Sequence, residues 1–190
     1  TFTVIEDIEK AFSTSDFTYS DADGDAFHGI KIITVESAGD LEYNNSDVTS
    51  NGGWLDVTNM DFTTASNGNG SPYATFTYKV YDGTAYSSST YTMTITATAM
   101  DDSPTISAPN SGNAYSANYA ENGSSSVADV NASDADGDVC TFTIAGTDAA
   151  DFSINSSTGV VTFVSSPNYE IPADDGGNNV YEFTVIVDDG

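Results

Sequence analysis

Basic residues are almost absent from this sequence. Its 190 residues include three lysines, no arginine and 29 aspartates and glutamates, which give a formal net charge of −26. Such a charge repels phosphate backbones and anionic lipid headgroups, so we expect neither nucleic acid nor a membrane surface as a partner. Acidity alone is also typical of disorder. Here, however, 38% of the residues are hydrophobic and 12% are aromatic, in alternating patterns that indicate a folded chain.

Cysteine, histidine and long apolar runs are equally scarce. Cys140 is the single cysteine, so no intrachain disulfide forms, and we expect it to be a small buried apolar residue. No apolar run reaches the roughly 18 residues of a membrane-spanning helix, so we expect no membrane insertion. His28 is the only histidine, and the Gly-x-Ser-x-Gly motif of serine hydrolases is missing. We therefore expect a protein that is not an enzyme.

Short alternating segments predict β-strands. Within residues 91–99, apolar side chains alternate with threonines, which is the period of a half-buried strand. Residues 75–81 and 182–187 alternate in the same way, and no segment shows the period of a helix. A further strand is expected at residues 54–62, with Trp54 in the core. Short strands separated by Gly, Asn and Asp turns favour an all-β fold of immunoglobulin-like sandwiches.

The hexapeptide Ser-Asp-Ala-Asp-Gly-Asp occurs twice, beginning at Ser20 and at Ser133. Each copy places three carboxylates at alternate positions, and two such charges about 5 Å apart repel by about 3 kcal/mol at an effective dielectric of about 20. Ca²⁺, a hard cation that takes about six to eight oxygen ligands, is the counter-charge that fits best. Neither copy is an EF-hand, because Ile32 and Ala145 stand where that loop needs its final glutamate. Residues distant in sequence must therefore complete the ligand set.

The second half of the chain resembles a cadherin repeat. The resemblance is carried by a set of acids and short motifs: Glu121, Asp134, Asp136, the pattern Phe-x-Ile-x-x-x-Thr-Gly-x-Val that begins at Phe152, Tyr169-Glu170 and Asp188. The preceding segment, Asp-Asp-Ser-Pro at residues 101–104, is similar to the acidic linker between such repeats. The first half matches less completely, because it has no counterpart of Tyr169-Glu170, for which Asp61 is a possible substitute.

This resemblance implies tandem modules of a large bacterial surface adhesin of the RTX type, secreted to the cell surface. It implies two Greek-key β-sandwiches, cadherin-like or immunoglobulin-like, at residues 1–100 and 105–190, joined by a calcium-binding linker at residues 101–104. Compared with the first module, the second ends before a final strand, which leaves an open sheet edge. We therefore expect the chain to be a piece of a longer protein.

The resemblance also implies several Ca²⁺ ions held between consecutive modules. At the central junction the implied ligands are Glu6, Asp101, Asp102, Asp134, Asp136 and Asp188. Asp21, Asp23 and Asp82 would face a module upstream, and Glu121 and Glu170 a module downstream. Asp25 and Asp138 are further candidates, and Asp174 and Asp175 are weaker ones.

Two functions remain open at this point, and a third, a glycan-active enzyme or its accessory domain, would need turnover of or binding to polysaccharide. In the first, the chain is a calcium-dependent cell-adhesion module whose ions stiffen the junction, and its partners are the neighbouring adhesin modules. In the second, it is a ligand-recognition module that binds a peptide or a glycan on a host or neighbouring cell through a pocket organised by Ca²⁺. An aromatic cleft near Tyr43, Trp54 or residues 67–73 would favour the second function.

Overall fold

The computed structural model describes residues 1–109 and 114–190, and these residues form an all-β chain. The chain divides into two compact units, Thr1–Met100 and Asp101–Gly190. The described residues also contain three single-turn 3-10 helices: η1 (Thr14–Asp16), η2 (Val57–Asn59) and η3 (Ala149–Asp151). None of the helices in this part of the chain has the length and apolarity to cross a membrane.

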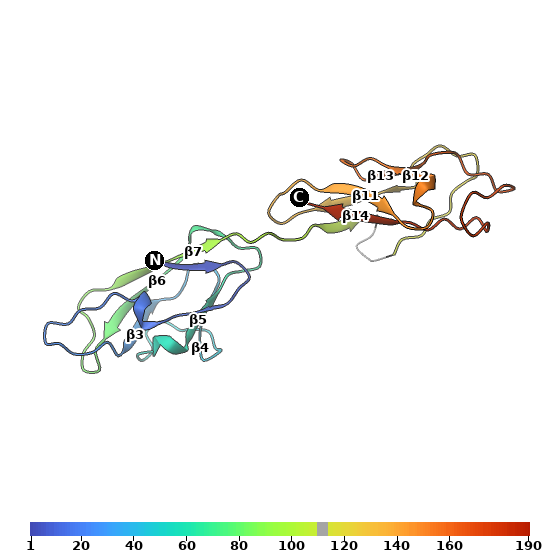
Figure 1. Ribbon diagram of the computed structural model, residues 1–190. Coiled ribbons are helices and arrows are strands. Elements are labelled where there is room, and N and C mark those ends of the chain that lie inside the picture. Colours follow the sequence, from blue (N-terminus) through green and yellow to red (C-terminus); the bar gives the residue numbers. More distant parts are fainter. Residues whose placement is uncertain (110–113) are drawn as a thin grey trace. The chain divides into compact units, whose positions relative to one another are not determined.

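The first unit consists of two sheets. The larger sheet has the order β1-β7-β6-β3, and its strands are β1 (Phe2–Ile5), β3 (Gly29–Thr34), β6 (Gly70–Tyr81) and β7 (Tyr91–Thr98) (Figure 1). The smaller sheet has the order β2-β5-β4, with β2 (Lys10–Ala11), β4 (Asp40–Tyr43) and β5 (Met60–Thr63). β1 runs parallel to β7, while every other pairing in this unit is antiparallel. The first three strands alternate between the two sheets, whereas β4 and β5 are neighbours in the smaller sheet and β6 and β7 are neighbours in the larger one.

The inward side chains of the two sheets form the core of the first unit. Phe76, Tyr78 and Val80 of β6 are buried at alternate positions, as the sequence pattern predicted. On β7 the alternation begins with the buried Met93, whereas Tyr91 is 47% exposed and lies outside the core. Stacked and edge-to-face rings fill the space between the sheets.

The second unit has shorter sheets and a smaller core. Its strands are β8 (Thr105–Ala108), β9 (Ala128–Asp129), β10 (Asn131–Ser133), β11 (Thr141–Ala145), β12 (Phe152–Ile154), β13 (Val160–Phe163) and β14 (Thr184–Asp188). They pair as β10-β8, β11-β14 and β12-β13-β9. Among the described residues β14 pairs with β11 alone, whereas β6 in the first unit pairs with both β3 and β7 (Figure 1). Accordingly Val185 and Val187 of β14 stay half-buried.

Three sequence expectations need correction. Residues 54–62 do not form one strand, because Asp56 accepts a hydrogen bond from the backbone N–H of Thr58 (3.0 Å) and begins η2 there. Trp54 consequently lies outside the core and is 41% exposed, so its predicted burial is wrong. Cys140, also expected to be buried, is half-buried against the second core.

Candidate metal centres

The first acidic loop, residues 20–25, is held in a tight turn by one of its own carboxylates. Oδ1 of Asp21 accepts hydrogen bonds from the backbone N–H groups of Asp23 (2.8 Å) and Asp25 (3.2 Å). Gly24 makes this turn possible, since its φ of +84° would strain any residue with a side chain. Oδ2 of Asp21 and the carboxylates of Asp23 and Asp25 take no part in these bonds. They remain for an external ligand.

The second acidic loop, residues 133–138, repeats this geometry. Oδ1 of Asp134 accepts from the backbone N–H groups of Asp136 (2.8 Å) and Asp138 (3.3 Å), and Gly137 has the same φ of +84°. The repeated hexapeptide therefore encodes a repeated three-dimensional turn. The two loops fold in the same way although the rest of the two units differs in sequence. This points to a common local function for the two loops.

Further carboxylates surround the second acidic loop. The backbone N–H of Asp102 donates to Oδ2 of Asp136 (2.9 Å), which brings the start of the second unit against the loop. The pKa of Asp101 is raised, first by the charge of Asp189, then by burial and by the three carboxylates of the loop. A raised pKa means that the ionised form is destabilised there by like charges. The site thus holds an excess of negative charge that a cation would neutralise.

Asp189 is a residue that the sequence analysis missed. It follows the half-buried Val187 by two positions, as Asp82 follows the buried Val80 in the first unit, so Asp189 is the structural counterpart of Asp82. The predicted ligand Asp188 lies on the opposite, exposed side of the strand, where its Oδ1 accepts from the N–H of Gly190 (3.0 Å). The strand period of two could have identified Asp189 from the sequence.

A buried oxygen at the second loop fits a cation. Oδ2 of Asp134 is inaccessible to solvent and, in the described part of the chain, accepts no hydrogen bond. A charged oxygen that is buried without a partner destabilises the fold by several kcal/mol unless a counter-charge is present. The acids grouped with it, Asp101, Asp136, Asp138 and Asp189, offer carboxylate oxygens, which are ligands that Ca²⁺ prefers. We conclude that these residues fit a hard divalent cation.

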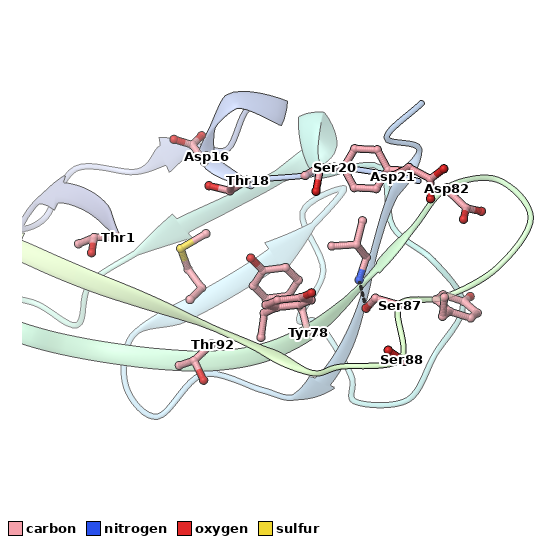
Figure 2. A pocket seen from close by; sticks show the side chains of 15 residues that line it. Thr1, Asp16, Thr18, Ser20, Asp21, Tyr78, Asp82, Ser87, Ser88 and Thr92 are labelled. Atoms are coloured by element: carbon pink, nitrogen blue, oxygen red, sulfur yellow. Dashed lines mark hydrogen bonds between the residues drawn. The ribbon is translucent and has the colours of Figure 1, made fainter. Parts of the chain in front are cut away.

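The first acidic loop borders a cavity of about 620 Å³ in the first unit. Asp21 and Asp82 line one end of this cavity and Thr1 lies toward the other, as Figure 2 shows. Asp82 has a lowered pKa, because its Oδ1 accepts from the N–H groups of Ala85 (2.6 Å) and Thr84 (2.7 Å). Burial and the charges of Asp21, Asp82 and Asp25 raise the pKa of the neighbouring Tyr19.

Glu6 is the most buried of the predicted ligands, at 1% exposure. Its Oε1 accepts from the backbone N–H of Met100 (2.7 Å) and its Oε2 from the side-chain amide of Asn69 (3.0 Å). Its own N–H donates to the carbonyl of Thr98 (3.0 Å). Glu6 therefore ties the end of β1 to the last residue of the first unit, and each carboxylate oxygen retains a lone pair for a second partner.

Glu121 and Glu170, predicted to face a downstream module, lie close together in the second unit. Oε2 of Glu121 accepts from the backbone N–H of Tyr169 (3.1 Å), the residue before Glu170. Glu170 itself is exposed, and its N–H donates to Oδ1 of Asn168 (3.0 Å). The structure thus brings the carboxylate of Glu121 to the loop that carries Glu170.

Another acidic group lies on the smaller sheet of the first unit and was not predicted. Carboxylate oxygens of Asp40, Glu42 and Asp47 lie within 4.8 Å of one another. Burial, followed by the charges of Asp40, Asp61 and Asp47, raises the pKa of Glu42. Asp61 pairs with Glu42 across β4 and β5, so it belongs to this group. That Asp61 replaces the counterpart of Tyr169-Glu170 stays a prediction.

Two buried carboxylates in the second unit have structural partners instead of free oxygens. Oδ1 and Oδ2 of Asp148 accept from the N–H groups of Asp175 (2.8 Å) and Glu182 (2.7 Å), and these bonds lower the pKa of Asp148. Asp174, a weak candidate from the sequence, accepts from the N–H groups of Asn178 (2.9 Å) and Asn179 (3.0 Å). Both residues shape the loop at residues 173–182.

The sequence matches no protein-family model and no curated protein. Among solved structures it is similar to mouse cadherin-23 EC22-24, with a TM-score of 0.46 and 17% identity over 85% of this chain and 47% of that chain. It is also similar to protocadherin gammaB7 EC3-6 (TM-score 0.41, 16% identity, 95% of this chain and 49% of that one). A third similar structure is mouse clustered protocadherin gammaC3 EC1-3, with a TM-score of 0.39 and 13% identity over 98% of this chain and 63% of that chain. The chain spans less than two thirds of the length of each of these structures. The assignment of its architecture rests on the strand order and register of this chain alone.

Proposed function

We propose that this chain is a calcium-dependent adhesion module of an extracellular protein, in which Ca²⁺ bound at the acidic loops stiffens a string of β-sandwiches. The observation that carries the proposal is the buried, unpaired Oδ2 of Asp134 inside a group of carboxylates. Extracellular calcium, at roughly millimolar concentration, suits modules that bind it with Kd of about 10⁻⁴–10⁻³ M. The bacterial surface adhesin implied by the sequence resemblance is the form of this proposal that we favour.

The ligands would come from three groups of carboxylates. In the second unit we propose Asp101, Asp102, Asp134, Asp136, Asp138 and Asp189, the last in place of Asp188. In the first unit we propose Asp21, Asp23, Asp25 and Asp82. Glu121 and Glu170 form the third group, with only two acids, which we expect to bind weakly unless a neighbouring module adds ligands.

Chain connectivity supports a role for the linker. Met100 donates its backbone N–H to Glu6 of the first unit, and Asp102 donates its own to Asp136 of the second. Asp101 is the single residue between these two donors, so we propose that Glu6 adds a ligand to the ion held by the second group. An ion bound on both sides of Asp101 would restrict the backbone dihedrals there. Calcium would then convert a flexible joint into a stiff one and hold a distal binding end away from the cell.

The proposal is tested by calcium titration in an isothermal calorimeter, with scattering measurements of particle dimensions before and after chelation. We expect saturable binding of at least one ion per acidic loop, and a larger, more flexible particle once calcium is removed. Asp134→Ala should abolish binding at the second loop, whereas Asp129→Ala, an exposed acid on β9 of the same unit, should not. Equal heats for the wild type and Asp134→Ala would refute the assignment.

A second function, ligand recognition, is favoured by the cavity next to the first acidic loop. Its walls carry hydroxyl groups and two of the proposed calcium ligands, Asp21 and Asp82, so a bound ion there would present open coordination positions to a ligand (Figure 2). A peptide or glycan that binds only with calcium present, and that fails to bind Asp82→Asn, would establish this function. If the protein binds no member of a glycan array or a peptide library, ligand recognition is refuted and the stiffening of the module string is the function that stands.

A further inference from the structure

A strip of aromatic side chains crosses the outer face of the larger sheet of the first unit. It consists of His28, Trp54, Tyr81 and Tyr86, which we call the aromatic strip. The rings of His28 and Trp54 have centroids 4.3 Å apart, those of Trp54 and Tyr81 lie 5.9 Å apart and within 22° of parallel, and those of Tyr81 and Tyr86 lie 4.8 Å apart. Four rings from three segments of the chain thus form one continuous aromatic surface.

The strand register explains why these rings meet. Gly29 of β3 lies directly opposite Tyr81 of β6, and Tyr81 forms a β-bridge with Tyr86. Their neighbours Ile30 and Val80 are buried in the core, so the side chains at the alternate positions point outward. A Cβ atom at Gly29 would lie 2.9 Å from a ring carbon of Trp54. The missing side chain therefore leaves the space that Trp54 fills beside Tyr81.

The strip is accessible and is not needed to close the core. Trp54 is 41% exposed and Tyr86 is 40% exposed, while the core of this unit is already filled by buried residues beneath the sheet. Large aromatic rings grouped on a surface, rather than scattered singly, are typical of a binding site. Their flat faces present area to a ligand at little cost in side-chain entropy.

The same face carries an unusual concentration of positive charge. Lys31 and Lys79, two of the three basic residues in the whole sequence, lie directly opposite each other on β3 and β6. Like charges at directly paired positions destabilise a sheet. The ammonium of Lys31 lies 5.5 Å from the ring centroid of Tyr86, and that of Lys79 donates to the carbonyl of Ser88 (3.2 Å). Among the described residues neither lysine forms an ion pair, although the chain has 29 carboxylates to offer.

We propose that the aromatic strip binds an acidic polysaccharide, with the apolar face of a uronic acid ring stacked on Trp54 and Tyr81 and its carboxylate paired with Lys31 and Lys79. A pyranose ring has C–H bonds on one face that pack against an aromatic ring, and the carboxylate of a uronic acid supplies an anion for the two lysines. A folded protein partner is disfavoured, because stable protein interfaces cover about 800 Å² on each side and the strip comprises four rings.

Trp54 is the only tryptophan in the chain, so its fluorescence reports on this site without interference. We would titrate the protein with a galacturonic acid tetrasaccharide and, as a matched control, with the same tetrasaccharide after reduction of its carboxyl groups. No calcium is added, because uronates chelate it, and circular dichroism verifies the fold first. We expect a saturable change in Trp54 emission, and at least ten-fold weaker binding of the reduced sugar.

Variants separate the contributions of ring and charge. Tyr81→Ala should weaken binding of both sugars at least ten-fold, whereas Lys31→Gln combined with Lys79→Gln should abolish the preference for the acidic one. Tyr169→Ala, at a 68% exposed tyrosine of the second unit, should leave both affinities unchanged. Calorimetry repeats each titration in case binding leaves the emission unaltered.

Three results would overturn the proposal. If neither fluorescence nor calorimetry detects binding of the acidic tetrasaccharide to the folded protein at millimolar concentration, the strip serves only to brace the sheet. If the reduced sugar binds equally well, the ligand is a neutral glycan. If Tyr81→Ala binds normally, the uronate binds elsewhere.

Discussion

Substitution of Asp134 by Asn removes one negative charge from the second acidic loop while retaining the side chain's shape. Asn keeps an oxygen that accepts the N–H bonds of Asp136 and Asp138, so the turn is preserved. What changes is the second atom, which is a buried unpaired oxygen in the wild type and becomes an NH₂ group. An amide nitrogen does not coordinate Ca²⁺. The variant therefore separates a metal-binding role for Asp134 from a purely structural one.

The expected magnitude follows from mass action. At calcium concentrations ten times Kd, each site stabilises the folded state by about 1.4 kcal/mol. For a unit the size of residues 101–190, this corresponds to an increase in Tm of about 6–11 °C. In Asp134→Asn we expect most of that increase to vanish. Without calcium the variant should melt no lower than the wild type, because loss of one carboxylate relieves repulsion with Asp136, Asp138 and Asp101.

Differential scanning calorimetry with chelator, and again with about 10 mM calcium, measures both quantities for a Kd near 1 mM. Trp54 emission, recorded in parallel, follows the first unit alone and so identifies which transition belongs to the second. Asp129→Asn is the matched control: an exposed acid of the same unit, which should keep the full calcium response. Should Asp134→Asn melt well below the wild type in chelator, the residue is structural. A wild-type Tm that is unchanged by calcium would refute the metal centre itself.

Three further predictions concern the stability of the first unit and the pH response. Glu6→Ala should lower the stability of the first unit by about 2 kcal/mol or more even in chelator, because the N–H of Met100 and the amide of Asn69 lose their acceptor; urea unfolding followed by Trp54 emission measures this. Phe62→Ala, at a fully buried ring, should cost about 3–5 kcal/mol in the same assay, and an effect below ~1 kcal/mol would contradict the described core. Without calcium, Asp101 has a higher pKa in the folded state than in the unfolded state, where it is about 4. Asp101 therefore stabilises the fold below about pH 4, and this stabilisation is lost as the pH rises through the pKa of the folded state. Asp148 has the opposite effect, because its pKa in the folded state is lower than its unfolded pKa of about 4. It stabilises the fold above about pH 4, and this stabilisation is lost as the pH falls through the pKa of the folded state. Melting curves from pH 3 to 8 should therefore show a mildly acidic optimum without calcium, shifting toward neutrality with it.

The sequence predicted the sheets well where side chains alternate without interruption. β6 and β7 follow the inward and outward periods read from residues 75–81 and 91–99, since burial of one face dictates the register. The prediction failed at residues 54–62, where a local hydrogen bond from Thr58 to Asp56 outweighs strand propensity. Trp54 was misplaced for the same reason.

The candidate sites were predictable in their local part only. The repeated hexapeptide fixes its own turn through hydrogen bonds that span four residues at most, so this glycine turn could be predicted from the sequence. The choice between Asp188 and Asp189 depends on the phase of β14, because a shift of one residue moves a side chain to the other side of the strand. Asp148 had no sequence signal, because its partners at Asp175 and Glu182 follow it by 27 and 34 residues.

The two units differ in how much they would depend on calcium. In the first unit β6 is paired on both edges, and Phe76, Tyr78 and Val80 are at most 7% exposed. In the second unit β14 is paired with β11 alone among the described residues, and its inward valines stay half-buried. Since hydrophobic stabilisation scales with the apolar area buried, the second unit has less of it to offset the repulsion among its acids. Chelation should therefore melt the second unit first, while Trp54 emission still reports a folded first unit; simultaneous melting of both units would show that the metal centres do not act where the core is weakest.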